Sequence, residues 1–163
     1  MQNSKIKTRE QAIEIAQRLR RGGEIIVTTN GSFDLIHPAH IRLFERSRNQ
    51  GDYLFVLLNS DSSIKRNKGE KRPIVQQADR AYVLSSLESV DYVTIFDEDK
   101  PLSILEQLKP HIHVKGGTYI PERVREEEDL LNSWGGKFIA LEEEPGYSSS
   151  NIIQRILDAY NGK

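Results

Sequence analysis

Short apolar runs separate stretches of helical periodicity along almost the whole chain. The apolar runs are rich in β-branched and aromatic residues and do not alternate with polar ones, as expected of strands buried on both faces. We therefore predict strands at residues 24–29, 53–58, 92–96, 111–115 and 137–141. We predict helices at residues 8–21, 40–51, 76–88, 101–109, 121–135 and 149–160, and a polar loop at 59–75.

The first of these helices carries clear end signals. Thr8, followed three residues later by Gln11, forms a capping box. The apolar residues between positions 12 and 19 then fall on one face, and Gly22-Gly23 ends the helix.

Strands and helices alternate along the chain, which is typical of a parallel sheet covered on both sides. We predict an α/β fold of the Rossmann-like, doubly wound type, with a five-stranded parallel sheet and helices on both faces. We expect residues 1–163 to form a single domain, because no linker or composition change divides them.

Composition excludes several classes of protein. The formal net charge is −1, which argues against binding nucleic acid through its phosphates. The chain has no cysteine, so it holds no disulfide, thiolate metal site or cysteine nucleophile. The longest apolar run, residues 53–58, is too short to span a membrane, and residues 1–10 lack the apolar core of a signal peptide. We expect a cytoplasmic protein with no membrane partner.

In such sheets, ligands bind at the carboxyl ends of the strands. The loop after the first strand contains His37 and His40, spaced i and i+3 where a helix begins, so both rings should project from one side of its first turn. Next to free backbone N–H groups and the positive end of the helix dipole, they would suit a phosphate. Alternatively, one histidine caps the helix and the other is exposed.

Two further loops offer phosphate-binding groups, each with a structural alternative. The basic run Lys65, Arg66, Lys68, Lys71 and Arg72 is either a solvated face or a polyphosphate site. Ser148-Ser149-Ser150 precedes the last helix, where serines serve as N-caps or as a hydroxyl cradle for phosphate oxygens.

The fourth strand ends in Gly116-Gly117, which allows a ligand to approach the backbone. His111 and His113 share a face of that strand, but no third ligand stands nearby, and we predict no metal site there.

These groups bind phosphate, and no nucleophile or strong general base stands out among them. They suit nucleotidyl transfer, in which a phosphate oxygen that is already deprotonated attacks the α-phosphate of a nucleoside triphosphate and pyrophosphate leaves. That step needs alignment and charge stabilisation more than proton abstraction. Mg²⁺ on the β and γ phosphates would serve as the cofactor.

Several motifs in order resemble the nucleotidyltransferase superfamily marked by an HxGH motif. Within it, the chain is similar to the adenylyltransferases of D-glycero-β-D-manno-heptose 1-phosphate that lack a kinase domain. The resemblance covers residues 25–156 and rests on these segments: 29–34, His37-Pro38-Ala39-His40, 59–61, 65–73, Asp79-Arg80, Val90-Asp91, Val114-Lys115-Gly116-Gly117 and 148–153.

The resemblance implies an N-terminal helix at 1–23, a catalytic core at 24–160, a homodimer, and ATP and a sugar 1-phosphate as substrates. His37, His40 and Lys65 would be catalytic. The nucleotide would be bound by Thr29, Asn30, Gly31, Ser32, Phe33, Arg80, Gly116, Gly117, Ser148, Ser149 and Ser150. The acceptor would be bound by Asp34, Lys65, Lys68 and Lys115.

Two other functions stay open. The related glycerol-3-phosphate cytidylyltransferases carry an Arg where this chain has Glu143, and a different stretch in place of 114–117; both differences favour the heptose type. A nucleotide-binding module without turnover is the third possibility, because Ala39 replaces the motif glycine and Thr118 replaces an Asp.

Overall fold

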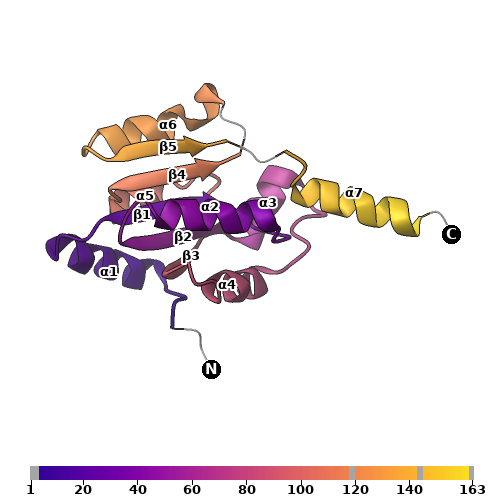
Figure 1. Cartoon of the computed structure of the whole chain (residues 1–163), viewed down its shortest axis with the longest axis horizontal. Helices are drawn as coiled ribbons and strands as arrows, with labels where there is room; N and C mark the ends of the chain where they lie inside the picture. Colours follow the sequence, from indigo (N-terminus) through magenta and orange to yellow (C-terminus); the bar gives the residue numbers. More distant parts are fainter. Residues whose placement is uncertain (1–3, 118–119, 143–144, 162–163) are drawn as a thin grey trace.

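The computed structural model describes residues 4–117, 120–142 and 145–161. Its centre is a five-stranded sheet in which all neighbouring strands run parallel, in the order β3-β2-β1-β4-β5 (Figure 1). The strands are β1 (Ile26–Gly31), β2 (Tyr53–Asn59), β3 (Tyr92–Phe96), β4 (Ile112–Gly116) and β5 (Lys137–Leu141). The predicted five-stranded Rossmann-like sheet is confirmed.

Helices cover both faces of the sheet. One apolar core joins a sheet face to α1 (Arg9–Arg21), α5 (Leu102–Leu108) and α6 (Pro121–Asn132). The other core joins the opposite face to α2 (Pro38–Arg48) and α4 (Gln77–Ser85). The predicted capping box of α1 is confirmed, since Thr8 and Gln11 exchange side-chain and backbone hydrogen bonds.

Two remaining helices lie at the carboxyl ends of the strands. Helix α3 (Asp61–Lys68) follows β2 directly, and α7 (Ser149–Tyr160) projects away from the rest of the molecule (Figure 1). The predicted loop at 59–75 is therefore wrong over α3. Its helix is capped by the Ser60 side chain, which accepts a hydrogen bond from the Ser63 backbone, and it buries a single apolar residue, Ile64.

Strands β1 and β4 diverge before they end. They pair through Val27–Thr29 and Ile112–Val114 only. Beyond that point Asn30 and Gly31 pair with β2, whereas the last two residues of β4 pair with β5. The order of strands reverses at this same place, so an opening forms where α/β sheets bind ligands.

The boundaries around this opening differ from those predicted. Strand β1 continues to Gly31, two residues beyond the predicted end at Thr29. Helix α2 begins at Pro38 rather than His40, with His37 as its N-cap residue. Proline is favoured at a first helical position because its missing N–H would be unpaired there in any case.

Candidate active site

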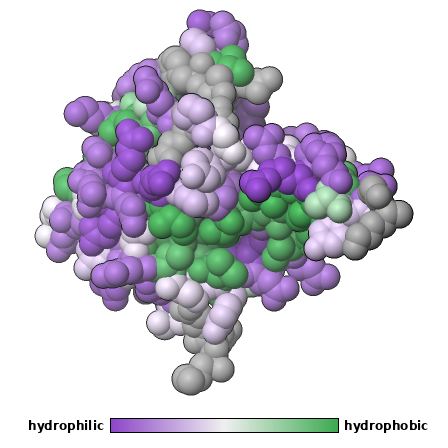
Figure 2. Space-filling model, turned by 45° about the vertical axis from the view of Figure 1, so that its right-hand side comes forward, coloured by the Kyte–Doolittle hydropathy of each residue, from purple (hydrophilic) through white to green (hydrophobic). Residues whose placement is uncertain are grey.

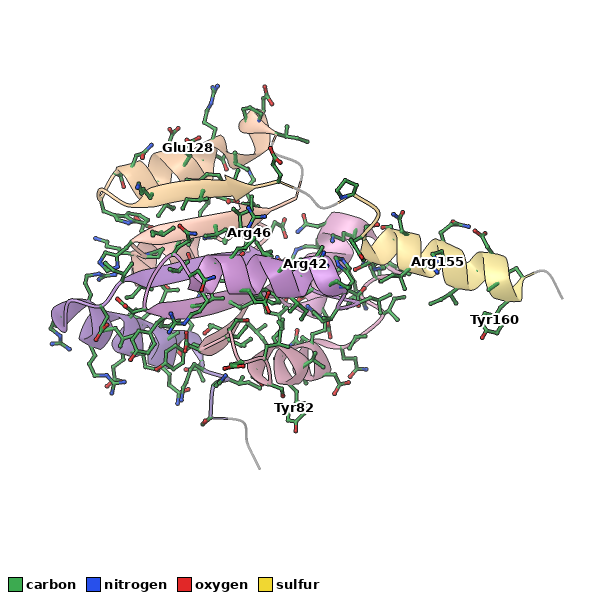
Figure 3. All side chains as sticks on the ribbon, viewed as in Figure 1. Arg42, Arg46, Tyr82, Glu128, Arg155 and Tyr160 are labelled. Atoms are coloured by element: carbon green, nitrogen blue, oxygen red, sulfur yellow. The ribbon has the colours of Figure 1, made fainter. Side chains whose placement is uncertain are left out.

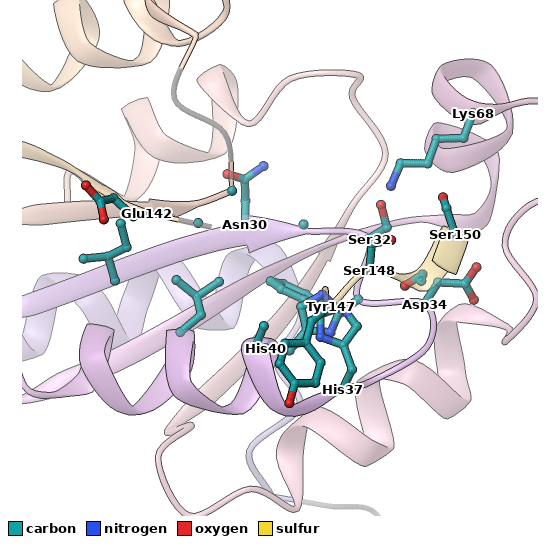
Figure 4. A pocket seen from close by; sticks show the side chains of 18 of the residues that line it. Asn30, Ser32, Asp34, His37, His40, Lys68, Glu142, Tyr147, Ser148 and Ser150 are labelled. Carbon is teal, nitrogen blue, oxygen red and sulfur yellow. The ribbon is translucent and has the colours of Figure 1, made fainter. Parts of the chain in front are cut away.

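A cavity of about 410 Å³ lies at the opening between β1 and β4 (Figure 4). Its walls come from the ends of β1, β4 and β5, the first turns of α2 and α7, and the last turn of α3. Its size is within the range of pockets that hold small molecules. It is lined by Asn30, Gly31, Ser32, Phe33, Asp34, His37, Ala39, His40, Leu43, Arg46, Lys68, Arg72, Gly116, Gly117, Leu141, Glu142, Tyr147, Ser148, Ser149 and Ser150.

The two histidines stack on each other at the N-terminus of α2. The ring centroids of His37 and His40 are 3.6 Å apart, with 22° between the ring planes. Each Nδ1 atom is buried and has no hydrogen-bond partner among the described residues, and the same holds for Oδ1 of Asn30 in the same cavity. Buried polar atoms are usually paired, so this set indicates a ligand with polar groups.

Both rings are neutral near pH 7. Burial lowers the pKa of His37. Burial, with repulsion from His37 and Lys68, lowers the pKa of His40 to about 4. A neutral imidazole still has one N–H, so each ring can donate a hydrogen bond to a phosphate oxygen.

The ring of Phe33 packs against His40. Phe33, only 5% exposed, meets the ring of His40 edge-on at a centroid distance of 5.2 Å and that of Phe44 at 4.9 Å. A Cβ atom on Gly31 would lie 2.9 Å from the Phe33 ring. Glycine at 31 therefore makes room for the ring that supports His40.

Asp34 binds the loop at residues 72–75, which is distant in the sequence, to the wall of the cavity. Its carboxylate accepts hydrogen bonds from the backbone N–H groups of Ile74 and Val75 and from Nε of Arg72, at 2.7–2.9 Å. Burial would raise the pKa of Asp34, but these donors hold it below its ordinary value. The carboxylate oxygens are thus used within the protein.

Two cations of the basic run reach the cavity. Lys68 and Arg72 line it, and Lys68 points inward beside Ser150 in Figure 4. Burial, followed by repulsion from Arg72, lowers the pKa of Lys68. An anionic group would relieve this repulsion, which indicates that the ligand is negatively charged.

The start of α7 forms the wall opposite α2. The Ser148 side chain caps the helix by accepting a hydrogen bond from the Asn151 backbone, and Ser149 Oγ donates to the Leu35 carbonyl at 3.3 Å. Tyr147 stacks on His37 with centroids 6.2 Å apart. The helices α2 and α7 both begin at the cavity, which favours an anion there.

The other end of the cavity, which we call the slot, is lined mainly by glycines and apolar side chains. Gly116 and Gly117 line it together with Leu43, Arg46 and Leu141, and Glu142 stands at its edge (Figure 4). A Cβ atom on Gly116 would lie 2.8 Å from the end of the Leu43 side chain, which would then have to shift, and Gly117 has a φ of +107°, which favours glycine. A planar ring suits a slot of this kind better than a phosphate does.

Four predicted site residues are not among those that line the cavity. Thr29 is fully buried in β1. Lys65 is half exposed, with Nζ 3.9 Å from the Glu70 carboxylate. Lys115 donates to Oε1 of Glu127 at 2.6 Å. Their contacts with substrate stay predictions.

The fourth, Arg80, is 1% exposed and supports the site from behind. Its guanidinium donates to the carbonyls of Ser32, Asn59 and Val75 and to the Asp61 carboxylate, at 2.6–2.9 Å. It joins the loop after β1 to the loop after β2. A direct contact of Arg80 with nucleotide stays a prediction.

Sequence reasoning missed several wall residues, namely Leu43, Arg46, Arg72, Leu141, Glu142 and Tyr147. Arg72 stood in the basic run but was not chosen as a site residue. Leu43 and Arg46 follow His40 at positions i+3 and i+6 on α2, so the helical period carried a signal for them. Thr118 and Glu143, two positions at which the sequence suggested specificity, lie outside the described residues.

The described residues contain no group of three or more His, Cys, Asp or Glu side chains that could hold a metal ion. Asp34 is already occupied by protein donors. The cavity offers mainly hydroxyls, cations and imidazoles, so a divalent ion would need ligands from a bound anion. No helix within the described part of the chain is long and apolar enough to cross a membrane.

Comparisons with known proteins show the family to which the chain belongs. Residues 28–155 match the family described as cytidylyltransferase-like. The chain is 45% identical over 158 residues to the bifunctional protein HldE of Syntrophotalea carbinolica, and 44% identical over 159 residues to that of Pelobacter propionicus. These matches cover 97% and 98% of this chain, but the chain spans about a third (32%) of each relative's length.

Solved structures give the same fold. The lipopolysaccharide core biosynthesis protein of Thermoplasma volcanium is 28% identical, with a TM-score of 0.62 over 77% of this chain and 100% of that one. The pantoate-beta-alanine ligase of Francisella tularensis, with a TM-score of 0.64, covers 97% of this chain and 79% of its own. At 15% identity, the latter shows the fold alone.

Proposed function

Because the chain belongs to the cytidylyltransferase-like nucleotidyltransferase family, we propose that it transfers an adenylyl group from ATP to a sugar 1-phosphate. The proposed acceptor is D-glycero-β-D-manno-heptose 1-phosphate, and the products are ADP-heptose and pyrophosphate. The HldE relatives, similar over nearly the whole chain, and the lipopolysaccharide core biosynthesis protein support a role in making ADP-heptose for cell-surface polysaccharide.

The reaction exchanges one P–O bond for another. An oxygen of the acceptor's phosphate attacks the α-phosphorus of ATP, and the bond from that phosphorus to the bridging oxygen of the β-phosphate breaks. The attacking oxygen carries no proton at neutral pH, so no general base is needed. Catalysis then depends on alignment and on donors aimed at the charge that develops around the α-phosphate.

Each wall of the cavity binds a different part of the two substrates. His37 and His40 donate to the α-phosphate, and the serines at the start of α7 hold the β and γ phosphates. Lys68 and Arg72 bind the acceptor's phosphate, while the slot beside Gly116 and Gly117 takes the base. Mg²⁺ enters with ATP and neutralises its β and γ phosphates. We place the reaction in the cytoplasm, where ATP is available.

The observation that carries the proposal is the stacked pair His37–His40 with unpaired Nδ1 atoms. The cations Lys68 and Arg72 and the N-terminus of α7 line the same cavity. This combination suits a polyphosphate better than any neutral ligand.

Pyrophosphate release tests the function. The protein is incubated with Mg²⁺ and each pairing of ATP or CTP with heptose 1-phosphate or glycerol 3-phosphate. We expect release only from ATP with heptose 1-phosphate. Release from CTP with glycerol 3-phosphate would instead assign a cytidylyltransferase, and ATP binding without release from any pairing would favour a module without turnover.

Substitution of the histidines tests their assigned role, and a matched control variant is available. His40→Asn should lower kcat about 100-fold, the scale for loss of one transition-state donor. His111→Asn makes the same change at the opposite end of the sheet, where Nδ1 of His111 accepts from the Ile26 backbone and an Asn oxygen can replace it. A loss under about threefold for both His37→Asn and His40→Asn would refute the role.

We also propose that the protein acts as a homodimer that pairs through α7. None of the α7 residues is buried, and Ile156, Leu157 and Tyr160 expose 50%, 44% and 73% of their surface. Figure 2 shows an apolar band that runs across the body toward α7, and Tyr82 and Tyr160 project to the same side in Figure 3. A twelve-residue helix is marginal by itself in water, so a second copy would supply its missing contacts.

A further inference from the structure

A second group of polar side chains lies beneath the cavity, on the sheet face covered by α6. It consists of Thr28 on β1, His113 and Lys115 on β4, and Glu127 on α6, and we call it the buried polar cluster. Thr28 and His113 are paired in the strand register. His113 is fully buried and Glu127 is 3% exposed.

The cluster is a chain of contacts from β1 to α6. Oγ1 of Thr28 lies 2.8 Å from Nδ1 of His113. Nε2 of His113 lies 3.5 Å from one carboxylate oxygen of Glu127, and Nζ of Lys115 donates to the other at 2.6 Å. The carboxylate of Glu127 therefore accepts a hydrogen bond from one residue of β4, Lys115, and lies against the ring of a second, His113, without a hydrogen bond to it.

Glu127 is the charged centre of this cluster. Burial lowers the pKa of His113, so its ring is neutral. Burial would raise the pKa of Glu127, but His113 and Lys115 outweigh it and hold the pKa below its ordinary value. A buried ion pair recovers little more than the cost of removing its charges from water. Stability alone is thus a weak reason for its presence.

The position of the buried polar cluster suggests why these charged groups are buried. The cluster includes Thr28–His113, one of the last two pairs between β1 and β4, and the two strands separate after the next pair, Thr29–Val114. Lys115 directly precedes Gly116-Gly117, which line the cavity, and Thr28 stands two residues before Asn30 on the other side of the opening. Whatever holds Lys115 and His113 therefore sets the width of the opening.

We propose that Glu127 is a positioning residue of the nucleotide site. From α6 it holds β4 through Lys115 and His113, and so places Gly116 and Gly117 at the correct distance from Asn30 and Gly31. Lys115 connects Glu127 to β4 and does not itself contact substrate. The inference rests on the proposed binding of ATP in the cavity.

Glu127→Gln, with Glu126→Gln as its control, tests the proposal. Glu126 is the preceding residue on α6, and its carboxylate pairs with Lys100 in solvent. We expect Glu127→Gln to raise the Kd for ATP about tenfold, measured by calorimetry, and to raise KM for ATP while kcat and KM for the acceptor stay within about twofold. Glu126→Gln should change none of these. Equal effects of the two variants would overturn the proposal.

A double-mutant cycle tests the part given to Lys115. If Lys115 acts only through Glu127, Lys115→Met should weaken ATP binding no more than Glu127→Gln does, and the double variant should weaken it about as much as Glu127→Gln alone. Losses that multiply in the double variant would mean that Lys115 contacts substrate by itself, which contradicts the proposal.

Amide hydrogen exchange without ligand separates this inference from the proposed function. In Glu127→Gln the amides of residues 114–117 should exchange faster than in the wild type, with no such change in Glu126→Gln. This readout decides the positioning role even if the wild type binds no ATP, a result that would refute the proposed function alone. Lys115→Met, at a partly exposed position, replaces Glu127→Gln if that variant fails to fold, and unchanged exchange there would overturn the inference.

Discussion

The residues of the site divide into those that face the cavity and those that hold them. His37, His40 and Lys68 line the cavity, and burial lowers the pKa of each. Phe33 and Asp34 also line it, but their main contacts are with the protein: one ring supports His40 and one carboxylate fastens the loop that carries Arg72. Substitution in the two groups should therefore have different effects.

The burial of His40 makes folding depend on pH. Its pKa is about 4 in the folded protein and near 6.5 in an unfolded chain, so between these values the unfolded chain binds more protons. The free energy of unfolding should therefore fall as pH is lowered from about 6.5 to about 4. Urea unfolding of wild type and His40→Asn over this range should show a shallower fall for the variant, and equal slopes would contradict the burial of the ring.

Ala39 allows a test of the departure from the HxGH motif. It lies at the second position of α2, where its methyl group lines the cavity beside the histidines. Ala39→Gly should lower KM for ATP by about threefold to tenfold while costing up to about 1 kcal/mol of stability. Ala78→Gly, at the second position of α4 and exposed, is the matched control, with a similar stability cost and no change in KM. An unchanged KM in Ala39→Gly would show that the methyl group does not obstruct the phosphate.

At the scale of elements, the site depends on how helices begin. Helix α2 presents His37 and His40 because proline starts it, and α7 presents serines because Ser148 caps it. Helix α3 was missed in the sequence because Ile64 is its single buried apolar residue, so the helical period was weak. Its end signals were present nonetheless: Ser60 as cap, Asp61 in the first turn and basic residues in the last.

The loop that carries Arg72 depends on Asp34. Asp34→Asn keeps the side chain's shape but removes the charge that pairs with Arg72. We expect KM for the acceptor to rise about tenfold and stability to fall by about 3 kcal/mol, because a mostly buried ion pair is broken. Kinetics and urea unfolding measure both.

Asp52→Asn is the control for that change. The Asp52 carboxylate accepts a hydrogen bond from the Ile25 backbone at the opposite end of the sheet. This variant should leave KM for the acceptor unaltered. A similar rise in KM in both variants would mean that Asp34 acts through general stability and not through Arg72.

At the scale of the whole molecule, the cavity and the buried polar cluster both lie where the order of strands in the sheet reverses. The cavity lies at the carboxyl edge, between the first turns of α2 and α7. The buried polar cluster lies beneath it, between β1, β4 and α6. Helix α7 contributes to the cavity at its first turn and projects into solvent beyond it (Figure 1).

The proposed pairing through α7 predicts a change in molecular mass. Leu157→Lys places a charge on the apolar face of α7 and should convert the dimer to a monomer, as measured by light scattering after size exclusion. Gln154→Lys places the same charge on the polar face, where Gln154 hydrogen-bonds to Asp158, and should leave the dimer intact. A wild type that is monomeric at all concentrations would refute the pairing.

The sequence by itself determined the α/β class and the parallel sheet, and it predicted a phosphate ligand. Apolar periodicity reports burial along one segment, and the residue types at the strand ends report phosphate chemistry. The family motifs likewise stand in order along the chain. Segments that depend on neighbours in sequence, such as the capped helix α1 and strand β5, were therefore predicted closely.

Only the tertiary structure decided which of these residues meet. It brought Lys68 and Arg72 to the cavity and left Lys65 beside Glu70. It turned Arg80 inward and joined Lys115 to Glu127, twelve residues away. The direction of a side chain depends on packing against segments far along the chain. The residue pattern within one short segment contains no information about that packing.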